Sequence, residues 1–129
     1  MEKNRVLIVD DAVQDIAVVM GVLSAQYAVQ VATSGLNALE QAKGTYTPDV
    51  VLLDVSMPEM DGYEVCRRFK SDDELKEIDI IFVSANDSIE EKLKGYDVGG
   101  LDYVTKPVNP AELMRKIELA IKSKQERKS

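Results

Sequence analysis

Apolar runs alternate with amphipathic segments along the chain, and this alternation is its main structural signal. Near-continuous apolar runs are typical of parallel strands that are buried on both faces. The runs predict five strands, at residues 5–10, 28–32, 49–54, 78–84 and 101–105. The run at 28–32 differs because it alternates between apolar and polar residues, which predicts a half-exposed strand at a sheet edge.

A helical pattern follows each predicted strand. The first helix is expected to begin near Val13, and the second to run from near Ser34 to a stop at Gly44. Apolar residues at helical spacing predict the inward-facing side of each helix. These positions are Val13, Ile16, Ala17, Met20 and Leu23 in the first helix, and Leu36, Leu39 and Ala42 in the second.

The other three helices are expected from their N-terminal patterns. A capping box joins an N-cap side chain to a glutamate three residues later. The pairs with this spacing are Asp61 with Glu64 before the third helix and Ser88 with Glu91 before the fourth. The fifth helix has Asn109 as its expected N-cap, Pro110 in its first turn and Glu112 behind it.

Repeated strand–helix alternation favours a parallel sheet with helices on both faces. Right-handed crossovers leave few possible topologies. We therefore expect an α/β fold with a flavodoxin-like, doubly wound, five-stranded parallel sheet of order 2-1-3-4-5 and five helices. This order places the first and third strands side by side, at the point where ligands bind in such sheets.

Composition narrows the class of protein. The 129 residues indicate one domain, expected at 1–122, followed by a charged tail or the start of a linker at 123–129. The net charge of −7 argues against a nucleic-acid surface. The single cysteine, Cys66, allows no internal disulfide, and we expect a cytoplasmic location. No apolar run reaches the ~18 residues of a membrane helix, so no membrane association is expected.

The chain contains no histidine. This absence excludes histidine metal sites, Ser-His-Asp triads and a phosphohistidine carried by the chain itself. No glycine-rich P-loop motif is present either. Any phosphoryl group must therefore come from another molecule.

Polar residues that suit phosphoryl chemistry follow four of the predicted strands. They are Asp10 and Asp11 after the first strand, Asp54 at the end of the third, Ser84 at the end of the fourth and Lys106 after the fifth. Parallel strands end at one rim, so these side chains are expected to lie together. Neighbouring carboxylates repel one another unless a proton or cation neutralises them. Such an oxygen-rich site suits Mg²⁺, and a carboxylate can form an aspartyl phosphate.

Several short motifs occur in order at these strand ends. They are Asp10-Asp11, Asp54-Val-Ser-Met-Pro58, Asp61-Gly62, Ser84-Ala85 and Tyr103-Val-Thr-Lys106-Pro107. Together, over nearly the whole length, they make the chain resemble the receiver domain of a two-component response regulator.

This resemblance implies a role for each rim residue. Asp54 is the implied phosphoacceptor, and Asp10, Asp11, Asp54 and the backbone carbonyl of Ser56 are the implied ligands of Mg²⁺. Lys106 pairs with the phosphoryl group, and the bond before Pro107 is cis. Ser84 follows the phosphoryl oxygens and Tyr103 changes rotamer with it, as switch residues. Ser56 and Asn86 are the implied tuning residues, which set how long the phosphoryl group survives.

Simpler roles remain open for some of these residues. Asp11 has the spacing to cap the first helix, with Gln14 completing a capping box. Ser84 has the alternative of a strand-end hydroxyl that bonds only to backbone, and Tyr103 that of an aromatic side chain that packs at the rim.

Three classes of function compete. The leading one is a signalling switch, not a substrate-turnover enzyme, which accepts phosphate from a sensor histidine kinase or histidine phosphotransfer protein and is reset by hydrolysis. The resemblance implies that phosphorylation alters the face formed by the fourth helix, fifth strand and fifth helix. This face would control a downstream effector domain or protein. It is also the expected interface of a homodimer, if one forms. The alternatives are an aspartyl-phosphate phosphohydrolase and a flavodoxin-like flavin binder. Ser56 replaces the second carboxylate that the hydrolase needs, and acidic rim residues disfavour a flavin phosphate.

Overall fold

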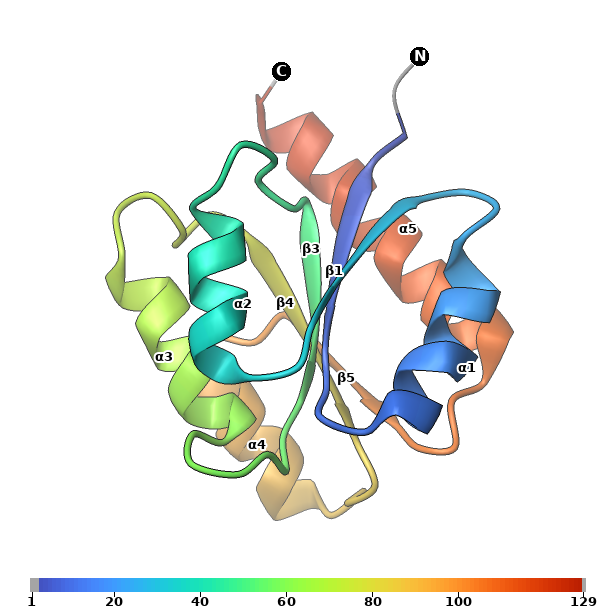
Figure 1. Cartoon of the computed structure of the whole chain (residues 1–129), viewed down its shortest axis with the longest axis vertical. Helices are drawn as coiled ribbons and strands as arrows, with labels where there is room; N and C mark the ends of the chain where they lie inside the picture. Colours follow the sequence, from blue (N-terminus) through green and yellow to red (C-terminus); the bar gives the residue numbers. More distant parts are fainter. Residues whose placement is uncertain (1–2, 129) are drawn as a thin grey trace.

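Strands and helices alternate strictly along residues 3–128, the part of the chain that the computed structural model describes (Figure 1). The strands are β1 (Arg5–Val9), β2 (Ala28–Ala32), β3 (Val50–Asp54), β4 (Asp79–Ser84) and β5 (Asp102–Thr105). The helices are α1 (Val13–Leu23), α2 (Gly35–Ala42), α3 (Gly62–Ser71), α4 (Ile89–Asp97) and α5 (Pro110–Lys128).

All five strands are parallel and form one sheet of order β2-β1-β3-β4-β5. This confirms the expected flavodoxin-like topology. Helices α1 and α5 cover one face of the sheet, and α2, α3 and α4 cover the other (Figure 1). β1 and β3 are neighbours, with Val9 opposite Leu53, so the loops that follow them leave the sheet side by side.

The hydrophobic core has two layers because successive strand residues point to opposite faces. Leu7 and Val9 of β1 pack in the layer under α2 and α3, whereas Val6 and Ile8 pack under α1 and α5. Every residue of β3 is buried. β2 is partly exposed over most of its length, which confirms the prediction of an edge strand.

The buried faces of the first two helices differ from the sequence prediction. α1 buries Ile16, Val19 and Leu23, while Val13 is 74% exposed and Ala17 and Met20 also face outward. Apolar residues occur on almost every side of α1, so periodicity alone does not select the packing face.

α2 turns small residues inward, and Leu36 is exposed, contrary to the prediction. Leu39 is partly buried and Ala42 buried, as predicted. The reason is close packing against α3: a Cβ atom at Gly35 would lie 2.6 Å from Val65 Cγ2. Small side chains therefore occupy the interface where a leucine would not fit.

The expected N-cap residues begin their helices. The side chains of Asp61, Ser88 and Asn109 accept hydrogen bonds from the backbone amides three residues later, at 2.9, 3.2 and 3.0 Å. The glutamates of the two expected capping boxes turn elsewhere, however. Glu64 pairs with Arg67 and Arg68, three and four residues later in the same helix. Glu91 accepts a hydrogen bond from Tyr63, a tertiary partner that sequence spacing did not reveal.

The C-terminal segment continues the last helix. Residues 123–128 belong to α5, so the charged tail is a helix end as far as the structure describes it, and Ser129 lies outside the described residues. Arg127 reaches back to the start of β4, with 3.6 Å between its Nη2 and Asp79 Oδ2. Within residues 3–128, no helix combines the length and hydrophobicity needed to cross a bilayer.

Candidate functional site

Three carboxylates meet where β1 and β3 end. Asp10 follows β1 directly, and Asp54 is the last residue of β3. Each of Asp10, Asp11 and Asp54 offers a carboxylate oxygen within 4.8 Å of the others. Asp10 and Asp54 are buried, at 5% and 6% exposure, whereas Asp11 is exposed. The structure thus brings together the acidic residues that the sequence placed at one rim.

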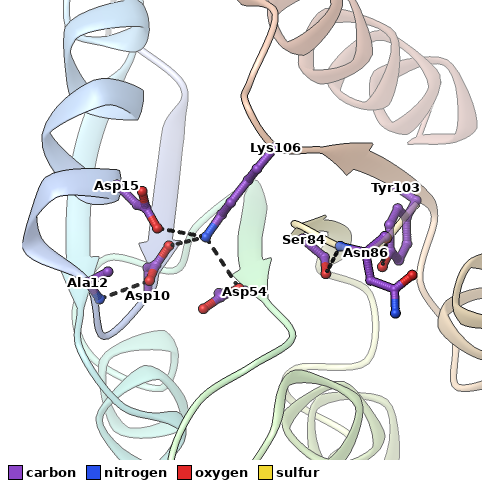
Figure 2. Close-up of polar contacts among 8 residues, drawn as sticks. All are labelled: Asp10, Ala12, Asp15, Asp54, Ser84, Asn86, Tyr103 and Lys106. Atoms are coloured by element: carbon purple, nitrogen blue, oxygen red, sulfur yellow. Dashed lines mark hydrogen bonds and ion pairs between the residues drawn. The ribbon is translucent and has the colours of Figure 1, made fainter. Parts of the chain in front are cut away.

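The ammonium of Lys106 faces this cluster from the end of β5 (Figure 2). Its Nζ lies 3.1 Å from Asp10 Oδ2 and 3.4 Å from Asp54 Oδ1. A third carboxylate, that of Asp15 in the first turn of α1, is closer still, at 2.9 Å. The peptide bond between Lys106 and Pro107 is cis, as the resemblance implied.

The charges at the site do not balance. Burial and the neighbouring Asp10 raise the pKa of Asp54 to about 6, although Lys106 and a backbone hydrogen bond from Ser56 oppose this shift. Burial alone would lower the pKa of Lys106, but hydrogen bonds to Asp15 and Asp10 and the charge of Asp54 raise it above its ordinary value. One ammonium therefore neutralises only part of the acidic cluster, and the excess negative charge favours a cation.

The donor set fits Mg²⁺. This ion prefers oxygen ligands, keeps several waters and often binds through one or two carboxylates. Among the described residues, the group of Asp10, Asp11 and Asp54 supplies carboxylate oxygens close enough to share one ion.

Asp10 also shapes the start of α1. Its Oδ1 accepts a hydrogen bond from the backbone amide of Ala12 at 2.9 Å. Ala12, not Asp11, occupies the N-cap position, and α1 has no side-chain cap. The expectation that Asp11 caps this helix is therefore wrong, because the chain reaches the helix one residue later and Asp10 binds the free amide.

The two predicted switch residues, Ser84 and Tyr103, both bond to Asn86 in the loop after β4 (Figure 2). Ser84 Oγ accepts a hydrogen bond from the Asn86 amide at 3.2 Å, and the Tyr103 hydroxyl donates to the Asn86 carbonyl at 2.9 Å. Tyr103 is 4% exposed, so its ring is turned inward. The backbone of Asn86 thus connects the end of β4 to β5.

The two predicted tuning residues line the same cleft. Ser56 and Asn86 line a cleft of about 240 Å³ together with Ser84 and, on the α4 side, Glu91 and Lys94. The structure therefore places Ser56, Ser84 and Asn86 around one space next to the end of β3.

Sequence reasoning missed three contributors. Asp15 binds Lys106, and its only signal was its place in the first turn of the helix that follows Asp10 and Asp11. Tyr63 donates to the Glu91 carboxylate and, at 3.1 Å, to its carbonyl, joining α3 to α4. Gly62 lies against the β3 end, where a Cβ atom would be 2.3 Å from the Asp54 carbonyl oxygen. The Asp-Gly pair that opens α3 was the visible sign of this close approach.

Comparisons with known proteins point to the same family as the residues of the site. The family model for the response regulator receiver domain matches residues 6–118. The chain is 36% identical over 124 residues to a protein of Vibrio cholerae named as a probable cyclic di-GMP phosphodiesterase, covering 96% of this chain and 28% of that protein. It is 35% identical over 114 residues to the response regulator PleD of Caulobacter vibrioides, covering 88% and 25%.

The chain spans 28% and 25% of the length of these two relatives. A solved structure of nearly the same length, the chemotaxis protein CheY4 of Vibrio cholerae, superposes with a TM-score of 0.85 at 31% identity and covers 92% of this chain and 98% of that one. The region matched by the family model contains the sheet from Val6 onward and includes Asp10, Asp54 and Lys106. By fold and by sequence, the chain belongs to the family of response regulator receiver domains, the signalling domains of two-component systems.

Proposed function

We propose that Asp54 accepts a phosphoryl group from a phosphohistidine on a sensor histidine kinase or a histidine phosphotransfer protein, in a step that requires Mg²⁺. The observation that carries this proposal is the position of Asp54. It is a buried carboxylate at a strand end, adjacent to two further carboxylates and 3.4 Å from an ammonium. Burying several carboxylates around one ammonium is costly, so this arrangement indicates a function.

In the proposed step the Asp54 carboxylate attacks phosphorus. A P–O bond to Asp54 forms as the P–N bond to the donor histidine breaks, and the histidine takes its electron pair back. With its pKa at about 6, Asp54 is mostly ionised at neutral pH and available as a nucleophile. Lys106 supplies a positive charge to the phosphoryl oxygens.

Asp10, Asp11, Asp54 and the backbone carbonyl of Ser56 would hold Mg²⁺, which when bound would neutralise charge on the phosphoryl group. The three side chains already lie within 4.8 Å of one another, so no large rearrangement of the cluster is needed. Water entering the cleft beside Ser56 and Asn86 would later hydrolyse the aspartyl phosphate, and these two side chains would set the lifetime.

The signal would pass through the loop after β4. A phosphoryl group on Asp54 would draw the Ser84 hydroxyl away from its bond with the Asn86 amide. Because the Tyr103 hydroxyl is bound to the same residue, β5 would respond, and with it the face formed by α4, β5 and α5. This face would control a downstream effector domain or protein, with homodimer formation as one means.

We propose a switch and not an enzyme that turns over other substrates. Ser56, two residues after Asp54, leaves no second carboxylate at the position where a phosphohydrolase of this type needs one. The proposed domain spans residues 1–122, although α5 continues past this boundary to Lys128.

The test is labelling with acetyl phosphate, followed by intact-mass spectrometry. The wild-type chain should gain one phosphoryl group in the presence of Mg²⁺ and none after chelation. Asp54→Asn should gain none. Asp73→Asn, at an aspartate that is 96% exposed in a surface loop, is the matched control and should label normally. Labelling that persists in Asp54→Asn would overturn the assignment.

A further inference from the structure

The ammonium of Lys106 contacts three carboxylates at once. A lysine ammonium has three N–H donors. In this structure Asp15, Asp10 and Asp54 lie at 2.9, 3.1 and 3.4 Å from Nζ, so the closest contact is the one farthest from the proposed chemistry (Figure 2). An incoming phosphoryl group can bind Lys106 fully only if one of these carboxylates releases it.

Asp15 is the carboxylate that can release Lys106 most easily. Its side chain is 45% exposed, whereas those of Asp10 and Asp54 are 7% and 8% exposed. Water can solvate a freed Asp15 carboxylate, but a freed Asp10 or Asp54 carboxylate would stay buried without its partner. Asp15 is also absent from the group of carboxylates that can share a metal ion.

Building on the proposed phosphoacceptor role of Asp54, we propose that Asp15 is a positioning residue for Lys106. It holds the ammonium toward α1 in the unphosphorylated state and competes with the phosphoryl group for it. Asp15 therefore slows phosphorylation and weakens the contact between Lys106 and a bound phosphoryl group. A half-exposed ion pair of this kind changes an equilibrium by about two- to fivefold.

The experiment compares Asp15→Asn with the wild type at saturating Mg²⁺. The rate constant of labelling by acetyl phosphate and the affinity for beryllofluoride should both rise about two- to fivefold. The affinity for Mg²⁺ alone should change by less than about twofold, because Asp15 is not a proposed metal ligand. Asp15→Glu keeps the charge and should return both values toward those of the wild type.

A matched control tests for a general effect of net charge. Glu40→Gln removes one negative charge from an exposed position of α2, on the opposite face of the sheet from α1, and should leave both values unchanged. Thermal melts check that each variant is folded.

Three outcomes overturn the proposal: Asp15→Asn leaves labelling and beryllofluoride binding unchanged or reduces them, Asp15→Glu behaves like Asp15→Asn, or Glu40→Gln reproduces the increase. The phosphoacceptor assignment fails separately, through labelling of Asp54→Asn or lack of labelling of the wild type.

Discussion

The hydroxyl of Tyr103 donates a hydrogen bond to the backbone carbonyl of Asn86, with 2.9 Å between the two oxygens. The amide of the same Asn86 donates to Ser84 Oγ. Ser84, at the end of β4, and Tyr103, within β5, are therefore both bonded to one loop residue. Ser84 and Tyr103 contact different atoms of the same residue. Under the proposed function, a ligand that moves Ser84 would also shift Asn86 and, through it, Tyr103.

We expect this coupling to appear when beryllofluoride and Mg²⁺ are added together. The amide resonances from Ser84 to Lys106 should shift, since both Ser84 and Tyr103 would lose their present hydrogen bonds with Asn86. Two-dimensional NMR of the labelled protein measures this. A spectrum in which this region stays unchanged, while beryllofluoride demonstrably binds, would show that the proposed switch is wrong.

Lys106→Ala should separate phosphorylation from metal binding. The phosphorylation rate should fall by roughly 10²-fold, because a positioned cation no longer contacts the phosphoryl oxygens. Mg²⁺ affinity should not fall, since removing the ammonium leaves Asp10 and Asp54 without their present counter-ion. Calorimetric Mg²⁺ titration and acetyl phosphate labelling measure the two effects. A loss of Mg²⁺ binding equal to the loss of labelling would contradict this division of roles.

The affinity for Mg²⁺ should depend on pH through Asp54. Its pKa is raised from 3.8 to about 6, so below pH 6 a proton occupies the carboxylate that the metal needs. Affinity should fall with decreasing pH, by up to about tenfold per pH unit. Titrations between pH 5 and pH 8 measure this, and Asp54→Asn should show a weaker dependence. An affinity that is constant from pH 5 to pH 7 would exclude this mechanism.

The metal-free protein should show the opposite trend in its stability. A carboxyl group whose pKa is higher in the folded state favours folding when it is protonated. The contribution of Asp54 is therefore complete below about pH 4 and is lost as the pH rises through about 6. Urea unfolding in the presence of a chelator measures the free energy of unfolding across this range, and Asp54→Asn should remove this component.

Gly62→Ala should destabilise the fold and impair phosphorylation. The added Cβ atom would lie 2.3 Å from the Asp54 carbonyl oxygen and 2.9 Å from Val55 Cα, and neither backbone atom can move without displacing the end of β3. A loss of about 1–3 kcal/mol in the free energy of unfolding is expected. Gly21→Ala is the matched control, because its Cβ atom would meet nothing within 4 Å and alanine favours the helix. Equal stability of the two variants would contradict the close contact.

Much of the fold follows from local sequence signals. The apolar runs predicted the strands, and the N-cap residues Asp61, Ser88 and Asn109 predicted three helix starts, to within a residue or two. A buried parallel strand needs a run of apolar residues, and an N-cap side chain bonds to amides of its own helix, so both signals are local. The end of α5 was missed, because the charged residues 123–128 continue the helix. The convergence of Asp10, Asp54 and Lys106 was also predictable, since parallel strands end at one rim.

Tertiary structure alone decided which side of each helix is buried and which carboxylates share Lys106. Val13 and Leu36 are as apolar as the residues that the core accepts, yet they face outward, because the space between a helix and its neighbours selects side chains by shape. Asp15 joins Lys106 across 91 residues of sequence, and Glu91 meets Tyr63 instead of completing its capping box. Such contacts depend on the relative placement of packed elements, and sequence periodicity carries no information about that placement.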